Sequence, residues 1–161
     1  MNSNHQRVLS ELREIFAKNT DKRICVIAAS CTGKTTLLQD LPECYEIDKE
    51  VWANLPKDVQ KQLGHLGKPW TLDEIEIFKG YCKAHEISIK PGRPLFSIYY
   101  HDCDLLVYLH LDEGEYISRV KKRSGDLESQ LKHRGKTIQR VKDATVPVII
   151  VDLSLPKQKR I

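Results

Sequence analysis

The sequence predicts an α/β protein built on a parallel sheet, and three observations lead to this prediction. Short apolar segments rich in β-branched residues alternate along the chain with segments that have helical spacing. Two of the apolar segments, 23–29 and 104–111, are almost continuous, which is typical of strands buried on both faces of a sheet. The chain has 161 residues, of which 40% are apolar and 30% charged, and this fits one domain with a substantial core.

Each element of the first half is predicted from its spacing or from a residue that ends it. Apolar side chains recur at helical spacing in the first segment. The helix after the first strand stops at Pro42, and a later helix begins with a capping box formed by Thr71 and Glu74. In chain order we expect a helix over 3–19, a strand over 23–29, a helix over 34–41, a short strand over 44–47, a segment broken by proline and glycine over 49–70, and a helix over 71–85.

The third strand has two candidate positions, 86–90 and 95–100, with the turn-rich segment from Lys90 to Pro94 between them. The pattern alone does not choose between these positions. The rest of the chain is expected to form a strand over 104–111, a helix over 113–123, a polar and mobile excursion with some helix over 124–137, and a last strand over 146–152.

Composition and charge limit the classes of function. The longest apolar runs are too short to span a bilayer, and the polar stretch at 1–16 has no apolar signal core, so we expect a cytoplasmic protein with no membrane association. Five cysteines without a CxxC pair predict reduced thiols and argue against a zinc module. The net charge of +4 permits an anionic partner without requiring nucleic acid.

Basic residues concentrate between Arg119 and Lys142, where nine lysines and arginines stand against Asp126 and Glu128. A solvated helical face is the ordinary explanation of such a run. Contacts with nucleic-acid phosphates are the alternative, and such binding would weaken steeply as salt rises.

The segment AASCTGKT at 28–35 is predicted to be a phosphate-binding loop between the first strand and the following helix. Backbone N–H groups in such a loop point at an anion, together with the helix N-terminus. Gly33 permits close approach of the backbone, Lys34 reaches the outer phosphates, and Thr35 offers a hydroxyl to Mg²⁺. The residues expected to contact the nucleotide are Ala29, Ser30, Cys31, Thr32, Gly33, Lys34, Thr35 and Thr36.

Ala28 departs from this pattern, which has glycine at that place. Glycine there mainly helps the chain to leave the strand, and alanine does the same when its φ is negative, at a cost of about 1 kcal/mol or less. The exchange removes no N–H that faces the phosphates. A tight strand–helix turn with a surface lysine is the alternative explanation of the segment.

Four features together resemble the small P-loop kinases that include shikimate kinase, gluconate kinase and the nucleoside monophosphate kinases. They are AASCTGKTT after the first strand, Tyr45-Glu-Ile-Asp48 after the second, DLLVYLHLDEGEYISRVKKR, and a basic lid-like segment followed by a strand. The resemblance implies a three-layer P-loop NTPase fold with a five-stranded parallel sheet in the order 2-3-1-4-5. It implies a single domain over 1–161, with an acceptor-binding insertion at about 49–85 and a lid at about 124–140.

Glu46 and Asp48 resemble the acidic pair that closes the second strand in the shikimate kinase branch. The resemblance implies that Glu46 lies by Mg²⁺ and that Asp48 orients or deprotonates the acceptor hydroxyl. Independently, a carboxylate at the carboxyl end of a parallel strand faces the crevice where α/β proteins bind ligands. A surface acid that caps the next helix is the alternative. Trp52 and Trp70 flank the insertion and either stack on an acceptor ring or pack in the core.

Arg119 and Arg123 are one helical turn apart and share a face. In the similar kinases such arginines bring guanidinium groups to the phosphates, where phosphoryl transfer needs positive charge. The resemblance therefore implies that Arg119 and Arg134 bind the nucleotide and that Arg123 acts in catalysis. Arg93 either clamps an anionic group of the acceptor or is a surface arginine in a rigid turn.

The predicted function is ATP- and Mg²⁺-dependent transfer of the γ-phosphoryl group to a nucleoside, a nucleotide or another small hydroxylated acceptor. Two alternatives are a kinase that acts on a hydroxyl of DNA or RNA and a nucleotide-binding module without transfer. Ala28 and the lack of a Walker-B acid at 86–90 favour the module. The expected roles are catalysis for Lys34, Asp48 and Arg123, acceptor binding for Asp48 and Arg93, and metal binding for Thr35 and Glu46.

Overall fold

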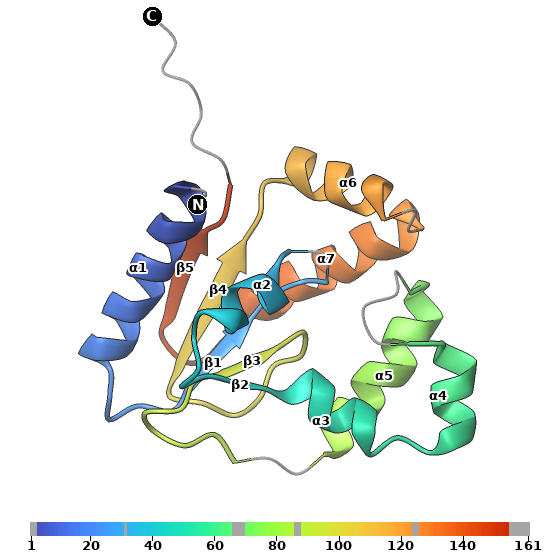
Figure 1. Ribbon diagram of the computed structural model, residues 1–161, viewed down its shortest axis with the longest axis horizontal. Coiled ribbons are helices and arrows are strands. Elements are labelled where there is room, and N and C mark those ends of the chain that lie inside the picture. The colour runs from blue at the N-terminus through green and yellow to red at the C-terminus, as the bar shows by residue number, and fades with distance from the viewer. Residues whose placement is uncertain (1–2, 31, 66–69, 86–87, 124–125, 155–161) are drawn as a thin grey trace, which may run out of the picture.

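The computed structural model describes residues 3–30, 32–65, 70–85, 88–123 and 126–154. These residues form an α/β fold around one five-stranded sheet, in which all neighbouring strands are parallel and the order is β2-β3-β1-β4-β5 (Figure 1). The predicted α/β class and strand order are therefore confirmed. The strands are β1 (Ile24–Ile27), β2 (Tyr45–Glu46), β3 (Leu95–Ser97), β4 (Leu105–His110) and β5 (Val148–Asp152).

The central strand β1 is buried along its whole length, because β3 and β4 pair with its two edges and apolar side chains cover both faces. Ile24 and Val26 belong to one apolar cluster, and Cys25 and Ile27 belong to another. Successive side chains of a strand point to opposite faces, so both sets must be apolar. This is why the strand is a continuous apolar run in the sequence.

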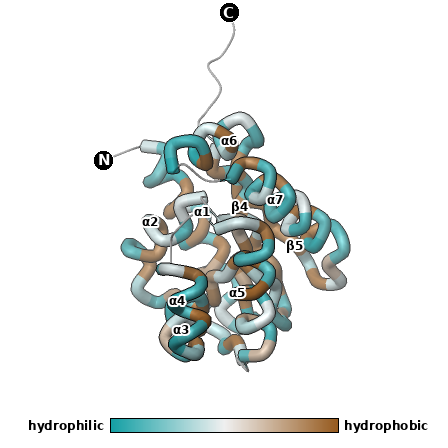
Figure 2. Tube along the Cα trace, turned by 90° about the vertical axis from the view of Figure 1, so that its right-hand side faces the viewer, coloured by the Kyte–Doolittle hydropathy of each residue, from teal (hydrophilic) through white to brown (hydrophobic). Residues whose placement is uncertain are grey.

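Helices cover both faces of the sheet and give the molecule three layers. One apolar cluster includes residues of α1 (Ser3–Lys18), α2 (Lys34–Gln39) and α6 (Glu113–Lys122). The other includes residues of α3 (Ile47–Ala53), α4 (Lys57–Leu63) and α5 (Leu72–Ala84), and α7 (Leu127–Lys142) contributes partly buried residues to both. The helices carry hydrophilic as well as hydrophobic residues along their length (Figure 2), as expected of helices that bury one side only.

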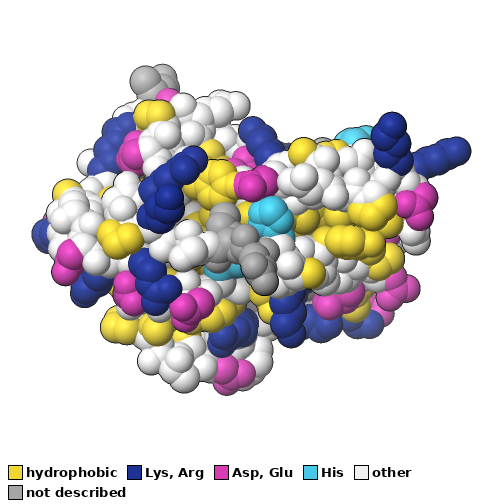
Figure 3. Space-filling view, turned by 90° about the horizontal axis from the view of Figure 1, so that it is seen from below, with side chains coloured by type: hydrophobic (Ala, Val, Ile, Leu, Met, Phe, Trp, Pro, Cys, Tyr) yellow, Lys and Arg dark blue, Asp and Glu magenta, His cyan; other side chains and the backbone are white. Residues whose placement is uncertain are grey.

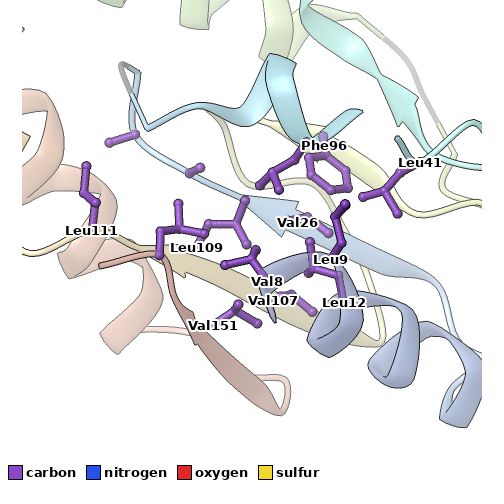
Figure 4. Packing of buried hydrophobic residues seen from close by; sticks show 14 of the residues in the cluster. Val8, Leu9, Leu12, Val26, Leu41, Phe96, Val107, Leu109, Leu111 and Val151 are labelled. Atoms are coloured by element: carbon purple, nitrogen blue, oxygen red, sulfur yellow. The ribbon is translucent and has the colours of Figure 1, made fainter. Parts of the chain in front are cut away.

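Helix α1 buries the stripe of its surface that the sequence predicts. Val8, Leu9 and Leu12 lie on one side of the helix and are at most 2% exposed. In Figure 4 they face Val107 and Val151 of the neighbouring strands. Burial of each such side chain stabilises the fold by about 1.5–3 kcal/mol.

The third strand is β3, at the second of its two candidate positions. Residues 86–87 of the first candidate lie outside the described residues, and Ser88 and Ile89 are not in a strand. The last residue of β3 is Ser97, so a hydroxyl stands at the carboxyl end of the strand that was expected to carry a Walker-B acid. The link from β3 to β4, over 98–104, contains no helix, and Ile98 and Cys103 pack into the cluster on its face.

The basic segment after α6 is more regular than expected. The helix predicted for part of 124–137 is longer than expected, because α7 runs for 16 residues from Leu127 to Lys142. The helix is held by buried residues, among them His133 and Thr137, which the polar composition of the segment does not suggest.

The capping box at Thr71 and Glu74 is present at the start of α5. No helix in the described ranges is long and apolar enough to cross a membrane.

Candidate functional site

The predicted phosphate loop lies between the carboxyl end of β1 and the start of α2, at the edge of the sheet where parallel α/β proteins bind ligands. Ala28 opens the loop and is fully buried within the apolar cluster around α1. Its N–H donates to the carbonyl oxygen of Ser97 at 3.2 Å. The alanine methyl group is thus packed in the core, and the position does not require glycine.

Arg119 holds the second half of the loop. Gly33 has φ 89°, a left-handed conformation that favours glycine, and a Cβ added there would lie 3.2 Å from Nη1 of Arg119. The same Nη1 donates to the carbonyl oxygen of Thr32 at 2.8 Å. The hydroxyl of Thr32 donates in turn to the carbonyl oxygen of Ala29 at 2.8 Å. The loop is therefore closed on itself and supported by a guanidinium group.

Lys34 and Asp48 form a buried ion pair at the centre of the site. Nζ of Lys34 lies 2.6 Å from Oδ2 of Asp48, and the side chains are only 9% and 8% exposed. The pair joins the first residue of α2 to the first turn of α3. The structure thus brings together the two residues for which the sequence predicts the central catalytic roles.

Two buried side-chain polar atoms lack a hydrogen-bond partner in the described part of the chain, and both belong to this site. They are Oδ1 of Asp48 and Nδ1 of His133. A buried polar atom without a partner costs about 1–3 kcal/mol, which a bound ligand or water that supplies the partner removes. Both side chains lie beside the predicted phosphate loop, His133 in contact with Ser30 and Asp48 in contact with Lys34.

Helix α7 contacts the first half of the loop through two side chains that the sequence reasoning did not select. Nε2 of His133 accepts a hydrogen bond from the N–H of Ser30 at 3.2 Å. The hydroxyl of Ser30 donates to Oε1 of Gln130 at 2.6 Å, and Nε2 of Gln130 donates to the carbonyl oxygen of Trp70. The only signal in the sequence is the spacing of three residues between Gln130 and His133, which places them on one helical face.

His133 is neutral, and its tautomer follows from its partner. Burial lowers the pKa of His133 to about 3, and the charges of Lys79, Lys34 and Lys136 add to the effect. Because Nε2 accepts from Ser30, the proton of the neutral ring is on Nδ1. The partnerless atom is therefore a hydrogen-bond donor.

Lys79 on α5 is a second donor in the same region. It is partly buried, and this burial lowers its pKa. No hydrogen bond or ion pair of Lys79 is found among the residues that the structure describes. Cys82, one turn further along α5, is close enough to Asp48, Lys34 and Lys79 for their charges to affect its thiol, whose pKa burial raises to about 12. Lys79 thus belongs to the surroundings of the Lys34–Asp48 pair.

The candidate metal ligands, Thr35 and Glu46, lie at the starts of α2 and α3. Thr35 and Thr36 are exposed in the first turn of α2. Glu46 precedes α3 and lies 3.6 Å from Lys49, which is largely exposed. No group of three or more histidine, cysteine, aspartate or glutamate side chains suited to a metal ion is found in the described ranges. A Mg²⁺ ion here would therefore need phosphate oxygens and water as further ligands, which is its usual requirement.

The other arginines of the predicted site, Arg123 and Arg134, lie at the end of α6 and on α7. Arg123 is exposed at the C-cap of α6. Arg134 donates to the carbonyl oxygen of Leu111 at 3.1 Å and lies over the ring of Tyr116, so it fastens α7 to the start of α6. Cys31 lies outside the described residues.

Arg93 belongs to a different surface from the Lys34–Asp48 pair. Its guanidinium lies 4.6 Å from the ring centroid of Tyr45. Both residues line a hollow of about 210 Å³ at the edge of the sheet, together with His85 and Lys90. This position favours the alternative in which Arg93 is a surface arginine beside a turn.

The two tryptophans pack in the core of the lobe formed by α3, α4 and α5. Trp70 is buried and its Nε1 donates to the carbonyl oxygen of Leu63 at 2.9 Å. Its ring centroid lies 6.0 Å from that of Trp52 and 5.1 Å from that of Phe78. Of the two alternatives that the sequence left open, core packing is the one this arrangement supports.

The basic charges of α7 are largely paired within the chain. Lys132 lies 3.2 Å from Glu128, Lys136 lies 2.9 Å from Glu76, and Arg140 lies over the ring of Tyr100. On the face shown in Figure 3, lysine and arginine side chains are interspersed with acidic ones.

Comparisons with models of known protein families and with curated proteins both find no match. The class of protein is therefore defined by its fold and its candidate site. The chain is an α/β protein with a five-stranded parallel sheet in the order 2-3-1-4-5. It has a strand–loop–helix unit of phosphate-binding pattern and a buried lysine–aspartate pair at the carboxyl edge of that sheet.

Loss of one partner of the buried pair is expected to destabilise the ligand-free protein. Lys34→Met leaves Asp48 buried without a counter-charge and should lower the free energy of unfolding by about 3 kcal/mol. The double change Lys34→Met with Asp48→Leu should recover most of this loss, because no uncompensated charge remains. Urea denaturation in the absence of nucleotide measures the free energy of unfolding of both variants. Lys18→Met, which disrupts the exposed pair of Lys18 and Glu14 on α1, is the control and should cost less than about 1 kcal/mol. Additive losses in the double variant would contradict the expectation.

His133 is expected to make stability depend on pH in the acid range. Its folded pKa of about 3 lies below its ordinary value, so between about 6.5 and 3 the unfolded chain binds a proton that the folded chain does not. Its contribution is complete above about pH 6.5 and declines by up to about 1.4 kcal/mol per pH unit as the pH falls. Urea denaturation between pH 7 and 4.5 should give a shallower slope for His133→Gln. The assignment to His133 would be contradicted if His133→Gln left the slope of unfolding free energy against pH unchanged. It would also be contradicted if the exposed control His65→Gln changed this slope equally.

Proposed function

We propose that the protein is an ATP-dependent kinase that transfers the γ-phosphoryl group to a small acceptor. The observation that carries the proposal is the Lys34–Asp48 pair beside the phosphate-loop segment, with one carboxylate oxygen left without a partner. A lysine that neutralises phosphate charge and a carboxylate that accepts a proton from a hydroxyl are the two groups that direct phosphoryl transfer needs most. Here they are in contact before any ligand binds.

The proposed mechanism assigns each step to a group in this arrangement. The first N–H groups of α2 have no carbonyl partner inside the helix, so they are available to the phosphates. The N–H of Ser30 already donates to His133, so this amide is not part of the phosphate cradle. Lys34 is drawn toward the terminal phosphates, and Asp48 is thereby freed to accept the acceptor proton. Mg²⁺, held by Thr35 and phosphate oxygens, would neutralise charge on the transferring group.

The acceptor proposed for this site carries an anionic group. The Nδ1–H of His133 and the ammonium group of Lys79 are donors without a hydrogen-bond partner in the described part of the chain, and both lie near the Lys34–Asp48 pair. A carboxylate or phosphate on the acceptor would supply the missing hydrogen-bond acceptors. This supports a nucleotide or a sugar-acid-like compound over an uncharged nucleoside.

The alternatives have less support. A kinase acting on DNA or RNA would use the basic stretch, but Lys132 and Lys136 are paired within the chain. One observation supports a binding module without transfer. Residue 97 at the end of β3 is a serine, whereas an acid at this place commonly assists a metal ion. A binding module would not explain why Asp48 is buried with one carboxylate oxygen that lacks a hydrogen-bond partner among the described residues. Phosphoryl transfer therefore remains the stronger proposal.

A transfer assay with γ-labelled ATP tests this function. The full chain is incubated with Mg²⁺ and a panel of nucleosides, nucleotides, sugar acids and oligonucleotides. Label is expected in a small anionic acceptor, and Asp48→Asn should lower kcat by about 100-fold or more. ATP binding by this variant should be unchanged or tighter, because the carboxylate no longer holds Lys34. Label that appears only as free phosphate with every acceptor would support the module, and label on oligonucleotides alone would support the nucleic-acid kinase.

Lys79 is expected to act on the acceptor and not on ATP. Lys79→Met should raise the KM for the anionic acceptor by about tenfold or more, while the KM for ATP changes little. Lys83→Met, an exposed lysine one turn further along α5, is the matched control. Steady-state kinetics with each substrate varied in turn makes the measurement. Equal effects of the two changes would remove Lys79 from the acceptor site.

A further inference from the structure

The link from β3 to β4, over 98–104, passes across the central strand β1, which lies between these two strands in the sheet. The link begins after Ser97, whose carbonyl oxygen accepts from the N–H of Ala28 just beyond the end of β1. It ends at Asp104, whose N–H donates to the carbonyl oxygen of Arg23 at 2.8 Å, just before the start of β1. The link therefore returns along the whole length of the central strand.

An arginine binds the end of this link to the start of β1. Nη1 of Arg23 lies 2.9 Å from Oδ2 of Asp102, and Nη2 lies 2.9 Å from Oδ1 of Asp104. Cys103 stands between these two aspartates, so their contacts with Arg23 limit where its side chain can lie. Cys25 comes two residues after Arg23, and side chains two apart along a strand lie on the same face. Cys25 is therefore on the face of β1 that the link covers.

The thiols of Cys25 and Cys103 are in hydrogen-bond contact on this face. Cys25 is fully buried and Cys103 is 3% exposed, and both belong to the same apolar cluster. The sulfur of Cys25 also accepts from the backbone N–H of His101, and the sulfur of Cys103 accepts from the hydroxyl of Tyr100. Both cysteines are free. Two segments that are far apart in the sequence thus bring two free thiols together.

The surroundings give the two thiols different acidities. Hydrogen bonds from Cys25 and Tyr100 lower the pKa of the Cys103 thiol, because they stabilise its thiolate. Burial and the charge of Asp102 oppose this effect. The contact with Cys103 and burial raise the pKa of Cys25. Cys103 is therefore the more readily ionised of the two, and the thiolate is the form of cysteine that attacks an oxidant.

A small oxidant has a short path to Cys103. Tyr100, whose hydroxyl contacts the sulfur, is only partly buried, and the exposed Arg140 lies 3.8 Å from the centroid of its ring. The sulfur is therefore one side chain below the surface. Hydrogen peroxide is uncharged and only slightly larger than water, so a rotation of Tyr100 is sufficient to admit it.

We propose that Cys25 and Cys103 form a site of reversible oxidation, at which hydrogen peroxide joins the two thiols in a disulfide. The inference is independent of the proposed kinase activity. The disulfide would tie the link over 98–104 to β1, the strand that leads into the phosphate-loop segment.

The proposed reaction has two steps. The thiolate of Cys103 attacks one oxygen of the peroxide, the O–O bond breaks, and hydroxide leaves and takes up the proton of this thiol. The product at Cys103 is a sulfenic acid. The sulfur of Cys25 then attacks the sulfur of Cys103, the S–O bond breaks, and hydroxide leaves with the proton of Cys25. The two thiols lose two electrons and two protons in total, and the peroxide is reduced to two molecules of water.

Peptide mapping of the full chain tests the proposal. The native protein is treated with hydrogen peroxide, blocked with iodoacetamide, digested and analysed by mass spectrometry. The expected product is a cross-linked pair of peptides that contain Cys25 and Cys103, and dithiothreitol should restore both thiols. Cys103→Ser should abolish the cross-link. Cys82→Ser removes another buried thiol of the same cluster, and this matched control should leave the cross-link unchanged. In Cys25→Ser, dimedone should label Cys103, because no thiol remains to displace the sulfenic acid.

The unchanged chain alone decides the outcome, so a variant that fails to fold does not leave the question open. Free glutathione in the same buffer shows that the peroxide is active. If glutathione is oxidised while Cys25 and Cys103 stay reduced, the proposal is wrong. It is also wrong if the disulfide joins other cysteines, or if the two residues are cross-linked only when urea unfolds the chain.

Discussion

The contact between Lys34 and Asp48 is the constraint from which the rest of the site follows. Removing two charges from water costs several kcal/mol each, and their attraction at 2.6 Å offsets this cost only when the two side chains are held in place. The fold does so by pairing β2 with β3 and β3 with β1, which brings the start of α3 beside the start of α2. Each partner of the pair compensates the buried charge of the other, and a bound polyphosphate would compete with Asp48 for Lys34. Binding of one ligand would thus release the group that acts on the other.

A second polar link joins the phosphate loop to the lobe of α3, α4 and α5. It runs from Ser30 to Gln130 on α7 and from Gln130 to the carbonyl oxygen of Trp70, just before α5. Buried polar networks hold one arrangement when every member has a partner. Among the described residues, the buried side-chain atoms without a hydrogen-bond partner are Nδ1 of His133 in this network and Oδ1 of Asp48 in the ion pair. One open atom is a donor and the other an acceptor, so a ligand with a hydroxyl and an anionic group would satisfy both.

The sequence predicts the fold better than it predicts the site, and the reason is the range of the interactions involved. Strands such as β1 and β4 are visible in the sequence because burial on both faces demands continuous apolar residues. Lys34 and Asp48 are visible because they occupy fixed places relative to a strand end. Lys79 and His133 are not visible, since their surroundings are made by the packing of α5 against α7, between segments about 50 residues apart. The hydrogen bond from Arg134 to the carbonyl oxygen of Leu111 is likewise not visible in the sequence, because it joins residues 23 positions apart.

The two departures from the usual phosphate-loop pattern, Ala28 and the acid missing from β3, meet at one hydrogen bond. The N–H of Ala28 donates to the carbonyl oxygen of Ser97, and both side chains are fully buried. The hydroxyl of Ser97 accepts from the N–H of Tyr99 at 2.9 Å, so it serves the turn after β3. A carboxylate at this position would be a charge in a place without solvent, whereas the neutral hydroxyl is paired with that N–H and with Nε2 of His101 at 3.3 Å. With no acid here, the proposed roles in metal binding and proton transfer fall to the second strand and the helix after it, where Asp48 is the one buried carboxylate on this edge among the described residues.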